Sequence, residues 1–354
     1  MSNQARLILL SGVGGSGTTS LASATAAAAS DEGLSCVVVD ATRVHDDADA
    51  MTSAAVAALV AGLQAEALPS ESWSGLASVA QLAAWQQIQA AVSQSGTDVV
   101  VVDGGSLREV QALVLLPQVL ERLLTAALTP TLAMRRVADT AGDQQAVPAF
   151  DRLAAVRDSV AQMVATMEND RTTLRLVTVP EENAVSQTLR AMSRFALLGI
   201  GVDAVVVNRF ARKADSREQR DAQQVQMDRI EAYAAGVRVW KSTTDVRAIP
   251  KGRSVLGPLG DPAALRGDFR PRVEEEGYLL DLSLTGDARR EARVGRAREF
   301  LVVEFDGIHR WIRLPSVLLR CRATHATRTP TGVTVAFVPD ASLWRTAPDE
   351  GSAA

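Results

Sequence analysis

A glycine-rich segment near the start of the chain has the spacing of a phosphate-binding loop. It reads SGVGGSGTTS over Ser11–Ser20. In a complete Walker A motif, backbone amides between two glycines cradle phosphate, a lysine neutralises it, and a hydroxyl binds magnesium. Gly12 and Gly17 occupy the glycine positions and Thr19 the hydroxyl position, but Thr18 stands where the lysine belongs. The segment therefore predicts a backbone phosphate site that lacks its usual positive charge.

No lysine nearby in the sequence replaces the missing one. Three of the 37 basic residues are lysines, and the first of them is Lys213. The glycines still allow an anion-binding nest at a helix N-terminus. A purely structural turn between strand and helix would use the same glycines, so both interpretations stay open at this point.

The apolar runs that surround the loop predict a parallel sheet. They are short, rich in Val and Leu, and occupy residues 7–10, 36–39, 99–102, 174–179 and 204–207. Runs of this kind are typical of strands that are buried on both faces. Helical patterns lie between them, over residues 19–32, 50–93 and 107–167. We expect an α/β domain over residues 1–260, with helices on both faces of the sheet.

The pattern changes after residue 260. Residues 261–277 combine glycine, proline and mixed charge, which is typical of a linker. From 278 to 340 apolar residues alternate with polar ones, and this alternation predicts a small β-sandwich. Residues 341–354 are expected to form a disordered tail. The alternating residues are Leu280, Leu282, Leu284, Val333, Val335 and Phe337.

Two apolar helical stripes have two possible interpretations. Either they belong to the core, or they form an exposed groove that holds an apolar client, because large exposed apolar patches usually mark binding sites. The groove candidates are Leu113, Leu116, Leu120, Leu123 and Leu124. The second stripe is Leu153, Val156, Val160, Val164 and Met167.

The order of these segments resembles the arsenite-pump ATPase family, which includes factors that target tail-anchored membrane proteins. That family's loop is similar to GKGGVGKTT, which places Val13 at its signature lysine and Thr18 at its Walker lysine; both lysines are absent here. The resemblance implies ATP or ADP and Mg²⁺ as cofactors. It places the phosphate contacts at Gly12, Gly14, Gly15, Ser16, Gly17, Thr18 and Thr19.

The resemblance also assigns roles to polar residues that follow the strands. The stretch DATRVHDD is similar to the family's first switch, which places Asp40 at the magnesium ion and Asp47 at the catalytic, water-orienting position. Asp103 corresponds to the Walker B aspartate, with a catalytic and metal-binding role, and Thr19 completes the metal site. The stretch VVVNRF is similar to a family strand that ends in an adenine-recognising asparagine, here Asn208.

Two further stretches extend the resemblance toward the C-terminus. VTVPEENAVSQTLRAM is similar to the family's V-T-x-P-E segment. The strands YLLDLSLTG, FLVVEFDGIHRWIRLP and GVTVAFVP resemble the small heat-shock-protein, or α-crystallin-like, domain that some members carry. Together the two resemblances cover most of the chain.

Composition limits the partners and the location. A net charge of −4 and a pI near 5.6 argue against nucleic acid as a partner. The two cysteines, Cys36 and Cys321, have no C-x-x-C spacing, so we expect neither a zinc site nor metalloid export. The sequence contains no pattern typical of a signal peptide or a spanning helix. We expect a cytoplasmic protein that reaches a membrane only through a partner.

Three functions fit these observations. The favoured one is a nucleotide-gated, or formerly gated, chaperone-like factor whose clients are apolar helices or membrane proteins. The second is an ATPase that a lysine-bearing partner completes, and the third is a scaffold that binds no nucleotide. The family resemblance implies a dimer, either of this chain with itself or with a lysine-bearing relative whose lysine reaches the neighbouring site.

Overall fold

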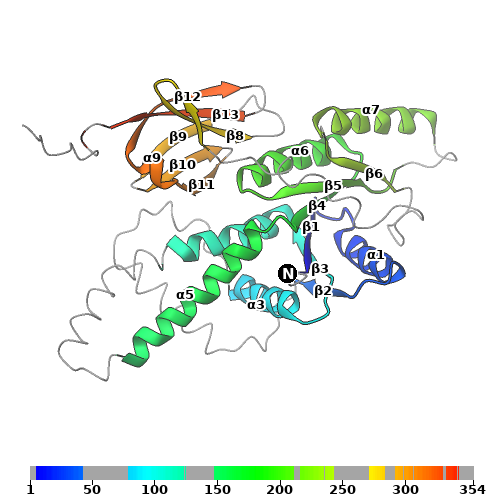
Figure 1. Ribbon diagram of the computed structural model, residues 1–354. Helices are drawn as coiled ribbons and strands as arrows, with labels where there is room; N and C mark the ends of the chain where they lie inside the picture. The colour runs from blue at the N-terminus through cyan, green and yellow to red at the C-terminus, as the bar shows by residue number, and fades with distance from the viewer. Residues whose placement is uncertain are drawn as a thin grey trace, which may run out of the picture.

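The computed structural model describes residues 5–42, 79–122, 124, 147–210, 216–234, 236–242, 271–283, 292–297, 299–305, 307–329, 332–340 and 342. Within them lie a six-stranded parallel sheet with packed helices and two smaller antiparallel sheets (Figure 1). The predicted class is confirmed: a Rossmann-like P-loop NTPase fold is followed by strands that fit a small C-terminal β-sandwich.

The parallel sheet places the glycine-rich loop at its centre. Its strand order is β2-β3-β1-β4-β5-β6, so β1 lies between β3 and β4. The strands are β1 (Arg6–Gly12), β2 (Cys36–Asp40), β3 (Val99–Ser106), β4 (Thr172–Thr178), β5 (Gly201–Val207) and β6 (Arg238–Lys241). The connections after β1 and β4 run in opposite directions, and open α/β sheets bind ligands at such a point, outside the carboxyl ends of the strands.

Helices cover both faces of this sheet. Ile8 and Leu10 of β1 pack with Leu21 of α1 (Thr18–Asp31) on one face. Leu7 and Leu9 point the other way and join a larger core. That second face is covered by α3 (Val79–Ser93), a helix over residues 107–122, α5 (Val147–Glu168), α6 (Glu182–Leu197) and α7 (Arg217–Tyr233). Among the described helices none is long and apolar enough to span a bilayer.

The leucine stripe that could have formed a groove belongs to the core. Leu113, Leu116, Leu120 and Leu124 are 1–4% exposed and pack within the larger core cluster. The Leu123 side chain lies outside the described residues. In the second stripe, Val160 and Met167 are buried in the same cluster, Val156 and Val164 are half-buried, and the Leu153 side chain is not described. The structure therefore favours the core interpretation of both stripes.

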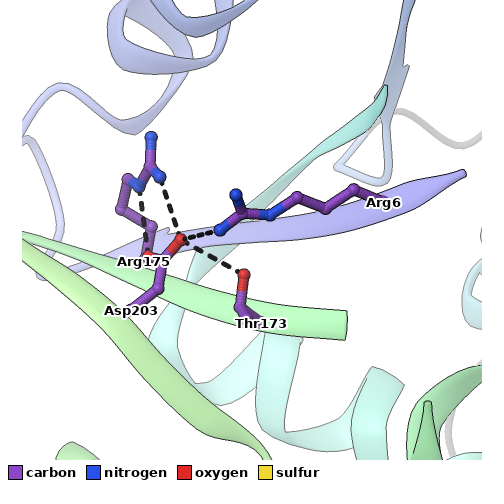
Figure 2. Close-up of polar contacts among 4 residues, drawn as sticks. All are labelled: Arg6, Thr173, Arg175 and Asp203. Carbon is purple, nitrogen blue, oxygen red and sulfur yellow. Dashed lines mark hydrogen bonds and ion pairs between the residues drawn. The ribbon is translucent and has the colours of Figure 1, made fainter. Parts of the chain in front are cut away.

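A buried ionic cluster links three strands of the sheet. The Asp203 carboxylate of β5 accepts hydrogen bonds from Arg6 of β1 (3.0 Å) and from Thr173 (3.2 Å) and Arg175 (2.9 and 3.2 Å) of β4 (Figure 2). The Arg175 guanidinium also lies 4.8 Å from the centre of the Trp240 ring in β6. Arg6 and Arg175 are 3% and 1% exposed. Burial lowers the pKa of Arg6, and the neighbouring Asp203 opposes that shift.

The C-terminal strands form two antiparallel sheets, ordered β11-β10-β9 and β12-β13-β8-β7. Their alternation matches the prediction, since Leu280, Leu282, Val333, Val335 and Phe337 are all buried. The elements are β7 (Pro271–Glu274), β8 (Gly277–Ser283), β9 (Ala292–Ala297), β10 (Phe300–Phe305), β11 (Ile308–Arg313), α9 (Ser316–Leu319), β12 (Cys321–Thr329) and β13 (Gly332–Pro339).

The sandwich begins earlier than the sequence predicts. Strand β7 pairs with β8 from Pro271 onward, so the C-terminal part of the predicted linker 261–277 belongs to a sheet. The sequence pattern did not predict this strand because β7 lies at a sheet edge and its residues are mostly exposed. Charged residues are common on such edges, so the strand lacks the apolar alternation. The rest of the predicted linker, 261–270, and residues 341 and 343–354 of the predicted tail lie outside the described residues.

The sandwich packs against the α/β domain. The buried residues of the sandwich belong to the same hydrophobic core cluster as Leu7 and Leu9, on the second face of the parallel sheet. Arg310 of β11 donates a hydrogen bond to the carbonyl of Leu197, the last residue of α6. Arg122 lies 4.7 Å from the centre of the Trp311 ring, and burial lowers the pKa of this arginine to about 10. The sandwich therefore contacts α6 and the helix over residues 107–122.

Candidate phosphate-binding site

The glycine-rich loop is a tight turn from β1 into α1. Gly17 caps the helix with φ 99°, a left-handed conformation that glycine adopts without strain. The Ser16 amide donates to the Val13 carbonyl at 2.9 Å. A Cβ at position 12 would collide with Ser16 Oγ and with the Val177 carbonyl. Glycine is therefore required at both ends of the loop.

The loop presents backbone amides at a helix N-terminus. Among the described residues, the amides of Gly14, Gly15, Gly17, Thr18 and Thr19 donate no hydrogen bond, and Gly14 and Gly15 are exposed. The helix that follows has 14 residues, so its N-terminus carries a partial positive charge. Amides in this arrangement fit phosphate oxygens. The residues present therefore fit the phosphates of a nucleotide. At position 18, however, Thr18 has a neutral hydroxyl group where a Walker A loop has the positively charged lysine.

Asn208 lies beneath the loop. Its side chain is fully buried, and its Nδ2 donates to the Ser16 carbonyl at 2.8 Å while its Oδ1 accepts from the Arg209 amide at 2.9 Å. A Cβ at Gly17 would lie 2.6 Å from Nδ2. Asn208 thus braces the loop from the end of β5. Its predicted contact with an adenine ring stays a prediction.

The two predicted metal-binding aspartates lie side by side on adjacent strands, Asp40 at the end of β2 and Asp103 within β3. Asp40 of β2 and Asp103 of β3 are paired in register. An oxygen of Asp40 accepts from the amide (3.0 Å) and the hydroxyl (2.6 Å) of Thr42, and one of Asp103 accepts from the Gly105 amide (3.2 Å). Asp103 is 2% exposed. Thr19, the third predicted ligand, is exposed at the start of α1.

These carboxylates do not form a complete metal cage. In the described part of the chain, no three His, Cys, Asp or Glu side chains cluster as metal ligands. Mg²⁺ commonly binds through one or two carboxylates together with substrate phosphates, and the paired Asp40 and Asp103 are groups of this kind. The part of Thr19 in such a site stays a prediction. The predicted catalytic residue Asp47 lies outside the described residues.

A cleft of about 600 Å³ opens beside the loop. Its walls come from three places: Gly12, Val13 and Gly14 of the loop, the start of the helix over residues 107–122, and one side of α6. Among the described residues, three arginines line it, and none of the described lining residues is acidic. These arginines are Arg108, Arg190 and Arg194.

The arginines reach the cleft from two helices. Arg190 and Arg194 are four residues apart on α6, so they lie on the same face of that helix. Arg108 lies in the first turn after Ser106, whose amide donates to Glu109 at 2.7 Å while its hydroxyl accepts from the Glu109 amide at 3.3 Å. This reciprocal capping box fixes the start of the helix. Burial lowers the pKa of Arg194.

Sequence reasoning missed the three arginines. Their only signal is the i,i+4 spacing of Arg190 and Arg194, which many solvated helices share. Arg190 and Arg194 lie beside the loop because β4 is next to β1, which places α6, the helix after β4, near the loop. Arg108 follows β3, the other neighbour of β1. That strand order is not readable from spacing alone.

Comparisons with known proteins agree with the fold. The chain is 26% identical to the uncharacterized protein SCO2128 of Streptomyces coelicolor, with 96% of this chain and 99% of that protein aligned. It is also 26% identical to Protein Rv2184c of Mycobacterium tuberculosis, where the alignment covers 60% of this chain and 57% of the relative. Residues 43–244, more than half of the chain, match the anion-transporting ATPase family, and this match begins after the glycine-rich loop. The chain belongs to the anion-transporting ATPase family.

Proposed function

We propose that this chain binds the phosphates of ATP or ADP at Gly12–Thr19 and hydrolyses ATP slowly or not at all. In this role it works as a nucleotide-gated binding factor. One observation carries the proposal: five amides of the loop and the first turn of α1 donate no hydrogen bond to any residue that the structure describes, while Thr18 replaces the lysine. Amides alone supply directional hydrogen bonds to phosphate, so they support binding.

Hydrolysis needs more than these amides. Negative charge shifts within the phosphate groups as the terminal phosphoryl group transfers, and fixed positive charge or donors stabilise that change. Removing a single such donor costs roughly 10²–10³ in turnover. Both lysines of the resembled loop are absent, at Val13 and Thr18, so slow turnover follows.

The gated partner is expected to be an apolar helix or a membrane protein. The leucines proposed to line a groove on the helix over residues 107–122, Leu113, Leu116 and Leu120, are buried, so they do not offer the binding surface. A client would have to contact other residues. The apolar segments within 43–78 and 125–146 lie outside the described residues, and client binding there stays part of the proposal.

A second candidate function is an ATPase completed by a lysine-bearing relative. Val13, which takes the place of the signature lysine, is half-exposed and lines the cleft, and the neighbouring Gly14 and Gly15 are exposed. A partner's side chain could approach the loop from this side. Purification from the native host, followed by turnover measurements on the complex and on its separated chains, tests this reading. If the relative hydrolyses ATP at the same rate with and without this chain, this second candidate function is contradicted.

The main proposal is tested by ATP turnover and affinity on the purified full chain. We expect saturable binding of ATP and ADP, and turnover far below the roughly 1 per second at the low end of typical enzymes. Thr18→Lys should strengthen ATP binding by about tenfold, because a hydrogen bond to a charged group contributes on that order. Turnover at or above about 1 per second by the wild-type chain alone would contradict the proposal.

A further inference from the structure

We infer that the arginine cleft beside the loop is a second part of the phosphate site. Arg108, Arg190 and Arg194 would bind the oxygens of a phosphate-bearing polyanion, with Gly12–Gly14 forming the opposite wall. The cleft thereby supplies the positive charge that the loop has lost. This inference takes the polyanion to be a nucleotide, and in that respect it rests on the proposed function.

The charge of the cleft is unusual for this molecule. The whole chain carries a net charge of −4, yet the part of the cleft wall that the structure describes holds three cationic side chains and no acidic one. Arg108 and Arg190 are exposed, and neither forms an ion pair within the described residues. Two acidic residues of the α6 N-terminal region, Glu181 and Glu182, precede Arg190 by at least eight residues, about 12 Å along the helix axis.

Arginine suits this role for chemical reasons. Its planar guanidinium presents a fork of N–H donors that matches two phosphate oxygens at once, and it keeps its charge at every physiological pH. A fork cannot lie beneath the phosphates as the Walker lysine does. It can contact a phosphate from the side, and the cleft opens beside the Gly12–Gly14 part of the loop rather than at Thr18 and Thr19.

The three arginines are not equally informative. Arg194 lies in the last turn of α6, where a cation is favourable beside the C-terminal carbonyls whatever the cleft binds. Arg190 and Arg108 have no such local role. Arg108 even lies in the first turn of its helix, where a positive side chain is unfavourable. The test therefore uses Arg108 and Arg190.

The experiment titrates inorganic pyrophosphate and ATP, each with and without magnesium, into the full chain by calorimetry. The variant is the double substitution Arg108→Gln and Arg190→Gln. The matched control is Arg217→Gln, an exposed arginine on α7 that does not line the cleft. We expect the double variant to bind both ligands at least about tenfold more weakly and with a shallower salt dependence. The control should bind as the wild type does.

The outcomes separate this inference from the proposed function. If the wild type and the double variant bind ATP equally, the arginine cleft is not part of the phosphate site, although nucleotide binding stands. If pyrophosphate binds through the arginines but ATP does not bind, the cleft is an anion site and the nucleotide proposal fails. If neither ligand binds the wild type, both are overturned. Circular dichroism of each variant confirms that a loss of binding is not a loss of fold.

Discussion

At the scale of single residues, the loop depends on Asn208. This side chain is buried at the end of β5, far along the chain from the loop, and donates to the Ser16 carbonyl at 2.8 Å. Gly17 can approach it closely because it has no Cβ. An asparagine at a strand end was predictable as a polar ligand, but the contact with Ser16 was not, because it depends on the three-dimensional position of β5.

Asn208→Ala distinguishes bracing from base recognition. If Asn208 braces the loop, the variant should lose about 1–3 kcal/mol of unfolding free energy, the cost of an unsatisfied buried group, and should bind pyrophosphate and ATP more weakly to the same extent. Chemical denaturation and calorimetry measure the two effects. Asn183→Ala, at an exposed position of α6, is the matched control and should change neither. A loss confined to ATP would instead identify Asn208 as the base-binding residue.

At the scale of elements, a buried carboxylate holds the centre of the sheet together. Asp203 serves two guanidinium groups at once, from β1 and β4, and both arginines are almost fully buried. Removing one partner of a buried ionic cluster is costly because the remaining charge loses its solvation and its counter-ion together. The cluster consequently fixes β1, whose carboxyl end leads into the loop, relative to β4 and β5.

Asp203→Ala should therefore lower the unfolding free energy by about 3–5 kcal/mol. The matched control is Asp158→Ala, since Asp158 pairs with Arg157 at 2.8 Å but both side chains are more than half exposed. That control should cost about 0–1 kcal/mol. Urea denaturation followed by circular dichroism measures both. Similar losses for the two variants would contradict the account of the cluster.

Much of the element pattern was predictable because it is local. Continuous Val and Leu runs identified five of the six parallel strands, and the alternation over Val333, Val335 and Phe337 identified the sandwich. The four-residue strand β6 was missed because RVWK is short and half basic. The cleft was missed for a different reason: its walls come from segments that only the strand order brings together.

At the scale of the whole molecule, the β-domain is joined to the helix that lines the cleft. Arg310 donates to the Leu197 carbonyl at the end of α6, and Gly199 leaves room for it, since a Cβ there would lie 2.7 Å from Arg310 Nη2. The two domains also share one core cluster. The sandwich is therefore expected to stay bound to the α/β domain.

Limited proteolysis tests this packing. We expect cleavage within residues 257–270, where glycine and proline are frequent, and we expect the two fragments to co-elute on size-exclusion chromatography under native conditions. Arg310→Ala should weaken the association, whereas Arg293→Ala, at an exposed position of β9, should not. A sandwich fragment that elutes separately from the wild-type digest would show that the interface is too weak to couple the domains.

The central claim, that this lysine-less loop binds nucleotide phosphates, is tested most directly by titrating ATP into three forms of the full chain. These are the wild type, Gly17→Ala and Gly33→Ala. Both glycines have positive φ, 99° and 77°, so both substitutions carry backbone strain, but of the two only a Cβ at position 17 meets Asn208. We predict that the wild type and Gly33→Ala bind ATP and that Gly17→Ala does not. ATP binding that survives in Gly17→Ala, or is absent from the wild type, would contradict the account.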